Sequence, residues 1–205
     1  MTKNNQTKRF IRSQGDLDGA CLLYSLVNAV SAINGEQIAA AKWSNLLKEI
    51  YDGRDFLDTR IGSGRMDMVL YTNTALFKYY LEALAPNAKF NVEILSNERG
   101  INRILEKNKE CKKEYEVKSN LKNIKNLIDA DSVLIVANKE HWFCIVDFDD
   151  SYAKIACSSK FNEFLEYSEQ KSKKLNRMFN TEDSIKNICT NMECIIKISQ
   201  IKSLC

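Results

Sequence analysis

The sequence predicts an α+β fold in which helices come first and a mostly antiparallel sheet follows. In the first half of the chain, apolar residues recur every three or four positions, which is the spacing of an amphipathic helix. After Asp131 the pattern changes to short apolar runs bounded by turn residues, which is typical of strands. With 205 residues, 44% hydrophobic and 28% charged, the chain is long enough to bury a core of its own.

The first helix has the clearest pattern. Residues 1–13 are polar and basic and predict a flexible arm, and a turn rich in Gly and Asp follows at 14–19. Asp18 is suited to cap the helix, and Asn34-Gly35 is a stop signal. One apolar stripe lies between these signals, made of Leu22, Leu23, Leu26, Val27, Val30 and Ile33.

The later elements follow in order. Further helices are predicted over about 37–51, over about 66–84 with Pro86 as the stop, and over much of 98–130. Strands are predicted over 90–94, 133–136, 141–148, 152–157 and 192–201, with Asp149-Asp150-Ser151 as a turn. Residues 160–189 read as helical or looped. We therefore expect a single domain over 14–205, with a helical lobe over about 14–130 and a sheet lobe over about 131–205.

Composition excludes several function classes. A net charge of +3 from 30 basic and 27 acidic residues is too close to neutral to indicate a nucleic acid or an anionic membrane as partner. Seven irregularly spaced cysteines and no visible secretory signal favour free thiols in a reducing cytoplasm. Cys189, Cys194 and Cys205 lack an evident fourth ligand, and there is a single histidine, so we expect neither a metal nor another cofactor.

Cys21 and His141 carry the candidate chemistry. Cys21 starts the first helix, where unpaired backbone N–H groups favour the thiolate, so we expect its pKa to fall below the ordinary value. Gln14 precedes it by seven residues and could donate to an oxyanion. His141 starts a strand, where a neutral imidazole can take the thiol proton. The alternative is a buried core cysteine and a histidine without a catalytic role.

Together these segments resemble the papain-like cysteine peptidase superfamily, nearest to its bacteriocin-processing peptidase branch. The resemblance rests on QGDLDGACLLYSLVNA at 14–29 and EHWFCIV at 140–146. It implies a papain-like fold, Cys21 as nucleophile, His141 as base and then acid, and Gln14 at the oxyanion. It also implies a protein or peptide substrate and no cofactor.

The sequence departs from the superfamily pattern at three points. The spacing from Gln14 to Cys21 is one residue longer than usual, and Leu22 stands where a Gly is common. In the superfamily, an Asn or Asp on the next strand orients the histidine. A hairpin symmetric about Asp149-Asp150 would instead bring Ser158 opposite His141, with Cys157 beside it.

Three explanations fit this last departure: a Cys–His dyad without a third member, an acid supplied by Asp16 or Asp18, or a degenerate site. The function therefore stays open between three classes. These are amide hydrolysis through a thioester, deamidation or acyl transfer at a protein glutamine by the same residues, and binding by an inactive peptidase scaffold. Oligomeric state has no signal in the sequence.

Overall fold

A six-stranded antiparallel sheet organises the structure, a computed structural model that describes residues 11, 21–39, 41, 42, 45, 74–96, 121–138, 141–159, 169–192 and 194–202. The strand order is β1-β8-β2-β3-β4-β7. The strands span Lys89–Ser96 (β1), Ser132–Ala137 (β2), Trp142–Phe148 (β3), Tyr152–Ala156 (β4), Thr181–Ser184 (β7) and Cys194–Ile201 (β8). The prediction of an α+β fold with a mostly antiparallel sheet is thus confirmed.

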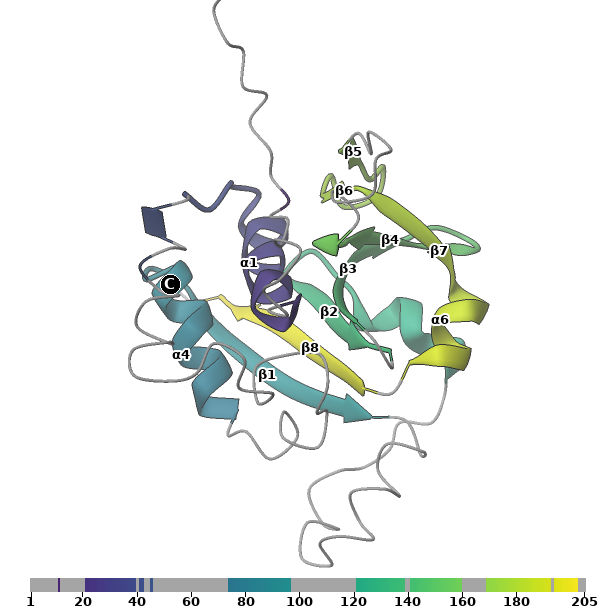
Figure 1. Cartoon of the computed structure of the whole chain (residues 1–205), viewed down its shortest axis with the longest axis horizontal. Helices are drawn as coiled ribbons and strands as arrows, with labels where there is room; N and C mark the ends of the chain where they lie inside the picture. Colours follow the sequence, from purple (N-terminus) through teal and green to yellow (C-terminus); the bar gives the residue numbers. More distant parts are fainter. Residues whose placement is uncertain are drawn as a thin grey trace, which may run out of the picture.

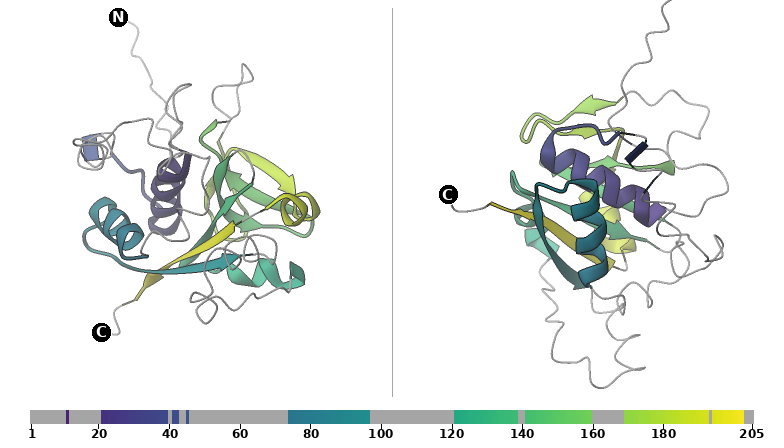
Figure 2. Two further views of the ribbon diagram at one scale, coloured as in Figure 1. Left: turned by 60° about the horizontal axis from the view of Figure 1, so that its bottom comes forward. Right: turned by 90° about the vertical axis from the view of Figure 1, so that its left-hand side faces the viewer.

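Two helices cover one face of this sheet: α1 (Cys21–Asn34) packs on β2 and β3, and α4 (Thr74–Leu84) packs on β1 (Figure 1 and Figure 2). The predicted stripe of α1 is buried except for Ile33, which is partly exposed. The helix stops as predicted, because Gly35 has a φ of +67°, a conformation that favours glycine. The end of α4 before Pro86 is also as predicted.

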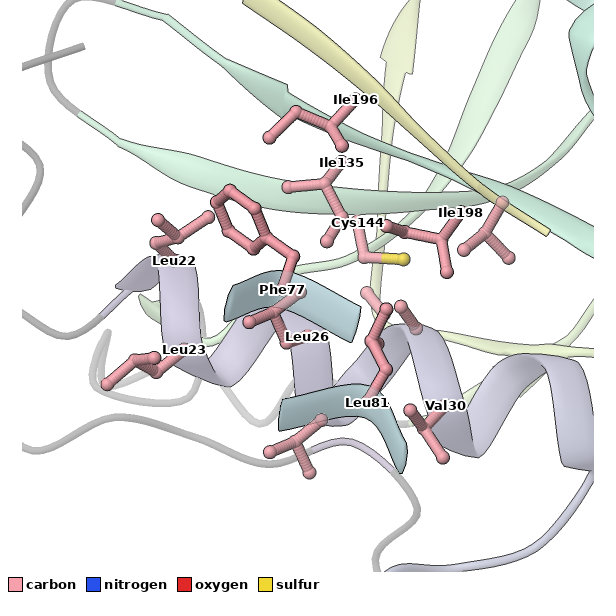
Figure 3. Packing of buried hydrophobic residues seen from close by; sticks show 14 of the residues in the cluster. Leu22, Leu23, Leu26, Val30, Phe77, Leu81, Ile135, Cys144, Ile196 and Ile198 are labelled. Carbon is pink, nitrogen blue, oxygen red and sulfur yellow. The ribbon is translucent and has the colours of Figure 1, made fainter. Parts of the chain in front are cut away.

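Both faces of the sheet are apolar, and alternate residues of each central strand supply two separate cores. Trp142, Cys144 and Val146 of β3 face α1, whereas Phe143 and Ile145 belong to the core on the other face. Figure 3 shows Leu22, Leu26 and Leu81 from the helices packed against Ile135, Cys144 and Ile196 from the sheet. The other core is closed by a 3-10 helix, η2 (Leu121–Leu127), and by α6 (Ile185–Asn191). A continuous apolar run such as 133–136 therefore reflects burial on both sides, as predicted.

Residues 160–189 differ from the prediction. Their described part, from 169, contains the two-stranded sheet β5 (Gln170–Lys171) and β6 (Met178–Phe179), then β7 and α6. The strands were missed because β5 and β6 have two residues each and β7 (TEDS) has no apolar alternation. Pairing with β4 holds β7 in place, and this pairing is a tertiary contact that local sequence does not encode.

The boundary between the two predicted lobes is crossed by β1. This strand lies within the expected helical lobe, yet it pairs with β8 along its whole length and forms one edge of the sheet. The second predicted helix does not start at 37, since residues 37–39 are described and are not helical. Ala41, Lys42 and Asn45 are helical, and the rest of that prediction lies outside the described residues. The predictions for residues 1–10, 66–73 and 98–120 also lie outside the described residues. No helix in the described part of the chain is long and apolar enough to cross a bilayer.

Candidate active site

Cys21 is the first residue of α1, and its side chain is buried at the start of β3. The first turn of a helix has N–H groups with no partner inside the helix. Burial raises the pKa of the Cys21 thiol, whereas the backbone N–H groups of Trp142, Leu22 and Cys21 itself lower it. The net direction is upward, so the expectation of a lowered pKa is wrong. Desolvation of the thiolate outweighs the partial charges that the helix start provides.

A tight turn holds His141 directly before β3. Its backbone N–H donates to Oδ1 of Asn138 at 2.7 Å, and the N–H of Asn138 donates to the His141 carbonyl at 3.0 Å. The ring is half-buried and stacks on Phe143, with 6.5 Å between ring centroids. Its Nε2 lies 3.2 Å from Sγ of Cys157. Because Trp142 follows His141 in the chain and its N–H acts on Cys21, the imidazole and the Cys21 thiol lie at the same end of β3.

Cys157 is the residue that contacts the imidazole, and its own backbone is fixed at both ends. Its N–H donates to Oδ1 of Asn180 at 2.9 Å, and its carbonyl accepts from Nδ2 of the same side chain at 2.8 Å. Sγ also lies 3.2 Å from Oγ of Ser159. A negative charge on Cys157 would raise the pKa of Cys21, although the two side chains belong to cores on opposite faces of the sheet. Ser158, the other candidate, is buried next to Cys157 in the chain.

The register of the β3–β4 hairpin puts His141 on the same face of the sheet as Cys157 and not as Ser158. The pairing of Cys144 with Ala156, continued along the strands, brings residue 159 opposite His141, and Cys157 lies two residues from it on the same face. The N–H of Asp149 donates to the Tyr152 carbonyl, which centres the turn between Asp150 and Ser151 rather than between Asp149 and Asp150. The register then shifts by one residue between Ile145 and Asp147. The predicted pairing of His141 with Ser158 assumed a regular hairpin and is wrong, since neither the displaced turn nor the bulge has a readable sequence signal.

The remaining candidates divide into two groups. Gln14, Asp16 and Asp18 lie outside the described residues. Asp147, on the strand of His141, is buried and accepts from the backbone N–H groups of Phe148 and Leu175, so it serves the backbone and not the imidazole. Among the described side chains, no group of three or more His, Cys, Asp or Glu residues is arranged to hold a metal ion.

Asn180 is a residue of the described site that the sequence analysis did not identify. It sits in a segment predicted as helical or looped, between Phe179 of β6 and Thr181 of β7. Its side chain is buried, and both polar atoms of its amide are satisfied there by hydrogen bonds to the backbone of Cys157. A single Asn in a polar segment carries no signal for such a role, since the contact spans 23 residues.

The site therefore combines a thiol at a helix start, a second thiol against an imidazole, and backbone N–H groups beside the first sulfur. This set can transfer a proton between sulfur and nitrogen and can stabilise a negative charge next to Cys21. Comparisons with protein-family models, curated proteins and solved structures found nothing that matches this chain.

Proposed function

We propose that the chain is a cysteine-dependent amide hydrolase with a papain-like fold, acting on a protein or peptide. One observation carries the proposal: the chain's single imidazole stands against a thiol, 3.2 Å from Nε2 to Sγ, at the strand end where Cys21 starts α1. The arrangement of α1 against an antiparallel sheet, with the histidine at the start of a strand, also agrees with the papain-like order of elements.

Cys21, and not Cys157, is the nucleophile in this proposal. An attacking thiol in an amide hydrolase needs N–H donors beside it for the oxyanion. The N–H of Cys157 is taken by Asn180, whereas Cys21 begins a helix and is surrounded by three backbone N–H groups. Cys157 is then a positioning residue that holds the imidazole, with Asn180 fixing Cys157 in turn.

The reaction has two steps. The Cys21 sulfur bonds to the amide carbonyl carbon while His141 takes the thiol proton, and the tetrahedral oxyanion is held by backbone N–H groups and by Gln14. Its collapse breaks the C–N bond, and the imidazolium gives its proton to the leaving amine. Water then attacks the thioester with His141 as base, and release of the carboxylic acid restores the thiol.

The raised pKa of Cys21 defines how the first step proceeds. Since burial keeps the free thiol protonated near neutral pH, proton transfer to His141 accompanies the attack, and no thiolate–imidazolium pair is stored beforehand.

A peptide library made by digesting a bacterial lysate tests the proposal, with mass spectrometry of the products. We expect new peptide termini from the native chain and none from Cys21→Ala. His141→Ala should lower the rate about 10²–10⁴-fold, because a general base is lost. Cys189→Ser, which removes a thiol outside the site, is the matched control and should keep the native rate.

Other outcomes overturn the proposal in distinguishable ways. Glutamine residues that gain about 1 Da without chain cleavage, in a Cys21-dependent manner, would make the chain a deamidase with the same residues. Products that persist in Cys21→Ala but vanish in Cys157→Ala would reassign the nucleophile. No product with the native chain would leave a binding scaffold, which is also favoured by the presence of Cys157, and not an Asn or Asp, against the His141 ring.

A further inference from the structure

A second feature of the described structure is a pocket about 160 Å³ in volume, between α1 and the β5–β6 sheet. Asn28, Ser31 and Ala32 of α1 line one side, and Lys171, Arg177 and Met178 line the other. Figure 1 shows β5 and β6 outside the main sheet, next to β4 and β7. The pocket is distinct from the candidate active site, since Ser31 lies ten residues beyond Cys21, about 15 Å along the helix.

The sheet also separates the pocket from the His141–Cys157 pair, whereas Cys21 lies on the same face as the pocket and is separated from it by distance along α1. Ala156, which borders the pocket, belongs to the core on the α1 face, whereas the next residue, Cys157, belongs to the core on the opposite face. Consecutive strand residues point to opposite sides, so these neighbours serve different sites. Nothing in the proposed hydrolysis uses the pocket.

Ser31 is the observation that points to a ligand. Its side chain is 6% exposed, and within the described structure its Oγ has no hydrogen-bond partner. A buried hydroxyl without a partner is costly and uncommon in folded proteins. The residue lines the pocket, so a ligand with a hydrogen-bonding atom there would satisfy it.

The charged side chains among the described residues that line the pocket are both basic. Lys171 is exposed and Arg177 is buried, and no carboxylate is among the described residues that line the pocket. The guanidinium of Arg177 donates to three backbone carbonyls, those of Ser132, Val146 and Ala130, at 2.6, 3.0 and 2.5 Å. Carbonyl oxygens hold the group in place, and nearby Asp147, Asp129 and Asp131 favour its charged form, although no described carboxylate forms a direct ion pair with it.

The volume of the pocket and the residues that line it restrict the class of ligand further. A cavity of about 150 Å³ lined by apolar residues is known to hold benzene, so this pocket fits a ligand of similar size. Ala32, Ala156 and Met178 supply apolar wall, and Ser31, Lys171 and Arg177 supply donors. We propose that the pocket binds a small organic anion, a carboxylate on a short alkyl chain, with Ser31 and Lys171 at the carboxylate end.

Titration of the full chain with butyrate tests this proposal, followed by amide NMR shifts. Butyrate has as many non-hydrogen atoms as benzene, and butyramide is its neutral counterpart. We expect saturable shifts with butyrate at Ser31, Gly35 and Asn176, which all line the pocket, and binding at least several-fold weaker with butyramide. Inorganic phosphate, which has no alkyl chain, should bind more weakly than butyrate.

Three variants test whether Ser31 and Lys171 bind the carboxylate. Ser31→Ala and Lys171→Met should each weaken butyrate binding by up to about fivefold, and the double variant by more than either alone. Both changes spare the fold, because Ser31 has no partner to lose and Lys171 is exposed. Lys173→Met is the matched control, since Lys173 is an exposed lysine of the same β5–β6 hairpin but does not line the pocket, and this variant should bind butyrate as the native chain does.

The proposal is overturned if butyrate and butyramide bind equally, if the shifts map elsewhere, or if the double variant binds as the native chain does. Because the readout is binding and not turnover, its failure is separate from any failure of the proposed hydrolysis.

Discussion

Two buried thiols lie along β3, one within the strand and one beside its start, and their surroundings differ. Cys144, in the middle, is fully buried among aliphatic side chains, and burial raises its pKa to about 12. Cys21, at the start, is as deeply buried, yet three backbone N–H groups lower its pKa and oppose the effect of burial. Burial alone therefore does not identify a structural cysteine. The donors around the sulfur separate a core thiol from a candidate nucleophile.

The largest expected effect is a loss of stability at high pH caused by Cys144. Its pKa is about 12 when folded against an ordinary value of 9.0, so the stabilisation is complete below pH 9 and is lost as the pH rises towards 12. Relative to Cys144→Val, we expect the native chain to lose about 1.4 kcal/mol of unfolding free energy per pH unit in this window. Urea unfolding of both chains at pH values below and above 9 measures this difference in unfolding free energy.

Cys189→Val is the control for this experiment. Burial also raises the pKa of Cys189, but its side chain is only partly buried, so we expect a smaller dependence on pH. A constant stability difference between the native chain and Cys144→Val across pH 9 would show that Cys144 is not insulated from water.

The same substitution at both thiols should have unequal effects on stability. In Cys144→Ser, a hydroxyl is buried among apolar groups, and we expect a loss of about 2 kcal/mol. In Cys21→Ser, the hydroxyl can accept from the N–H groups that already surround the sulfur, and we expect a loss below about 1 kcal/mol. Urea unfolding midpoints of the two variants measure these losses of stability. Equal losses of stability would show that Cys21, like Cys144, is an ordinary core residue.

The smallest expected effect concerns Cys157 and rests on the proposed function. Cys157→Val removes the contact with Nε2 of His141, and we expect Cys21-dependent turnover to fall about tenfold. Cys157→Ser should recover most of the rate, because a hydroxyl also bonds an imidazole nitrogen. Unfolding midpoints of both variants are the control for a purely structural effect. If the two variants turn over equally, Cys157 does not position the imidazole.

Much of the fold was predictable because long apolar patterns reflect burial directly. The stripe of α1, its stop at Asn34-Gly35, the end of α4 and the run at 133–136 were all read from local periodicity. The short strands β5 to β7 were not, since two to four residues carry too little pattern and their partners are far away in the chain. The predicted cap Asp18 and the oxyanion donor Gln14 lie outside the described residues.

By itself the sequence determined the α+β class, the position of Cys21 at the start of a helix and that of His141 at the start of a strand. These follow from hydrophobic periodicity and turn residues, which act over neighbouring positions. The tertiary structure alone decided that the imidazole meets Cys157, that Asn180 holds Cys157, and that the pKa of Cys21 is raised. Those outcomes depend on a displaced turn, a bulge and desolvation, which arise only when distant segments pack together.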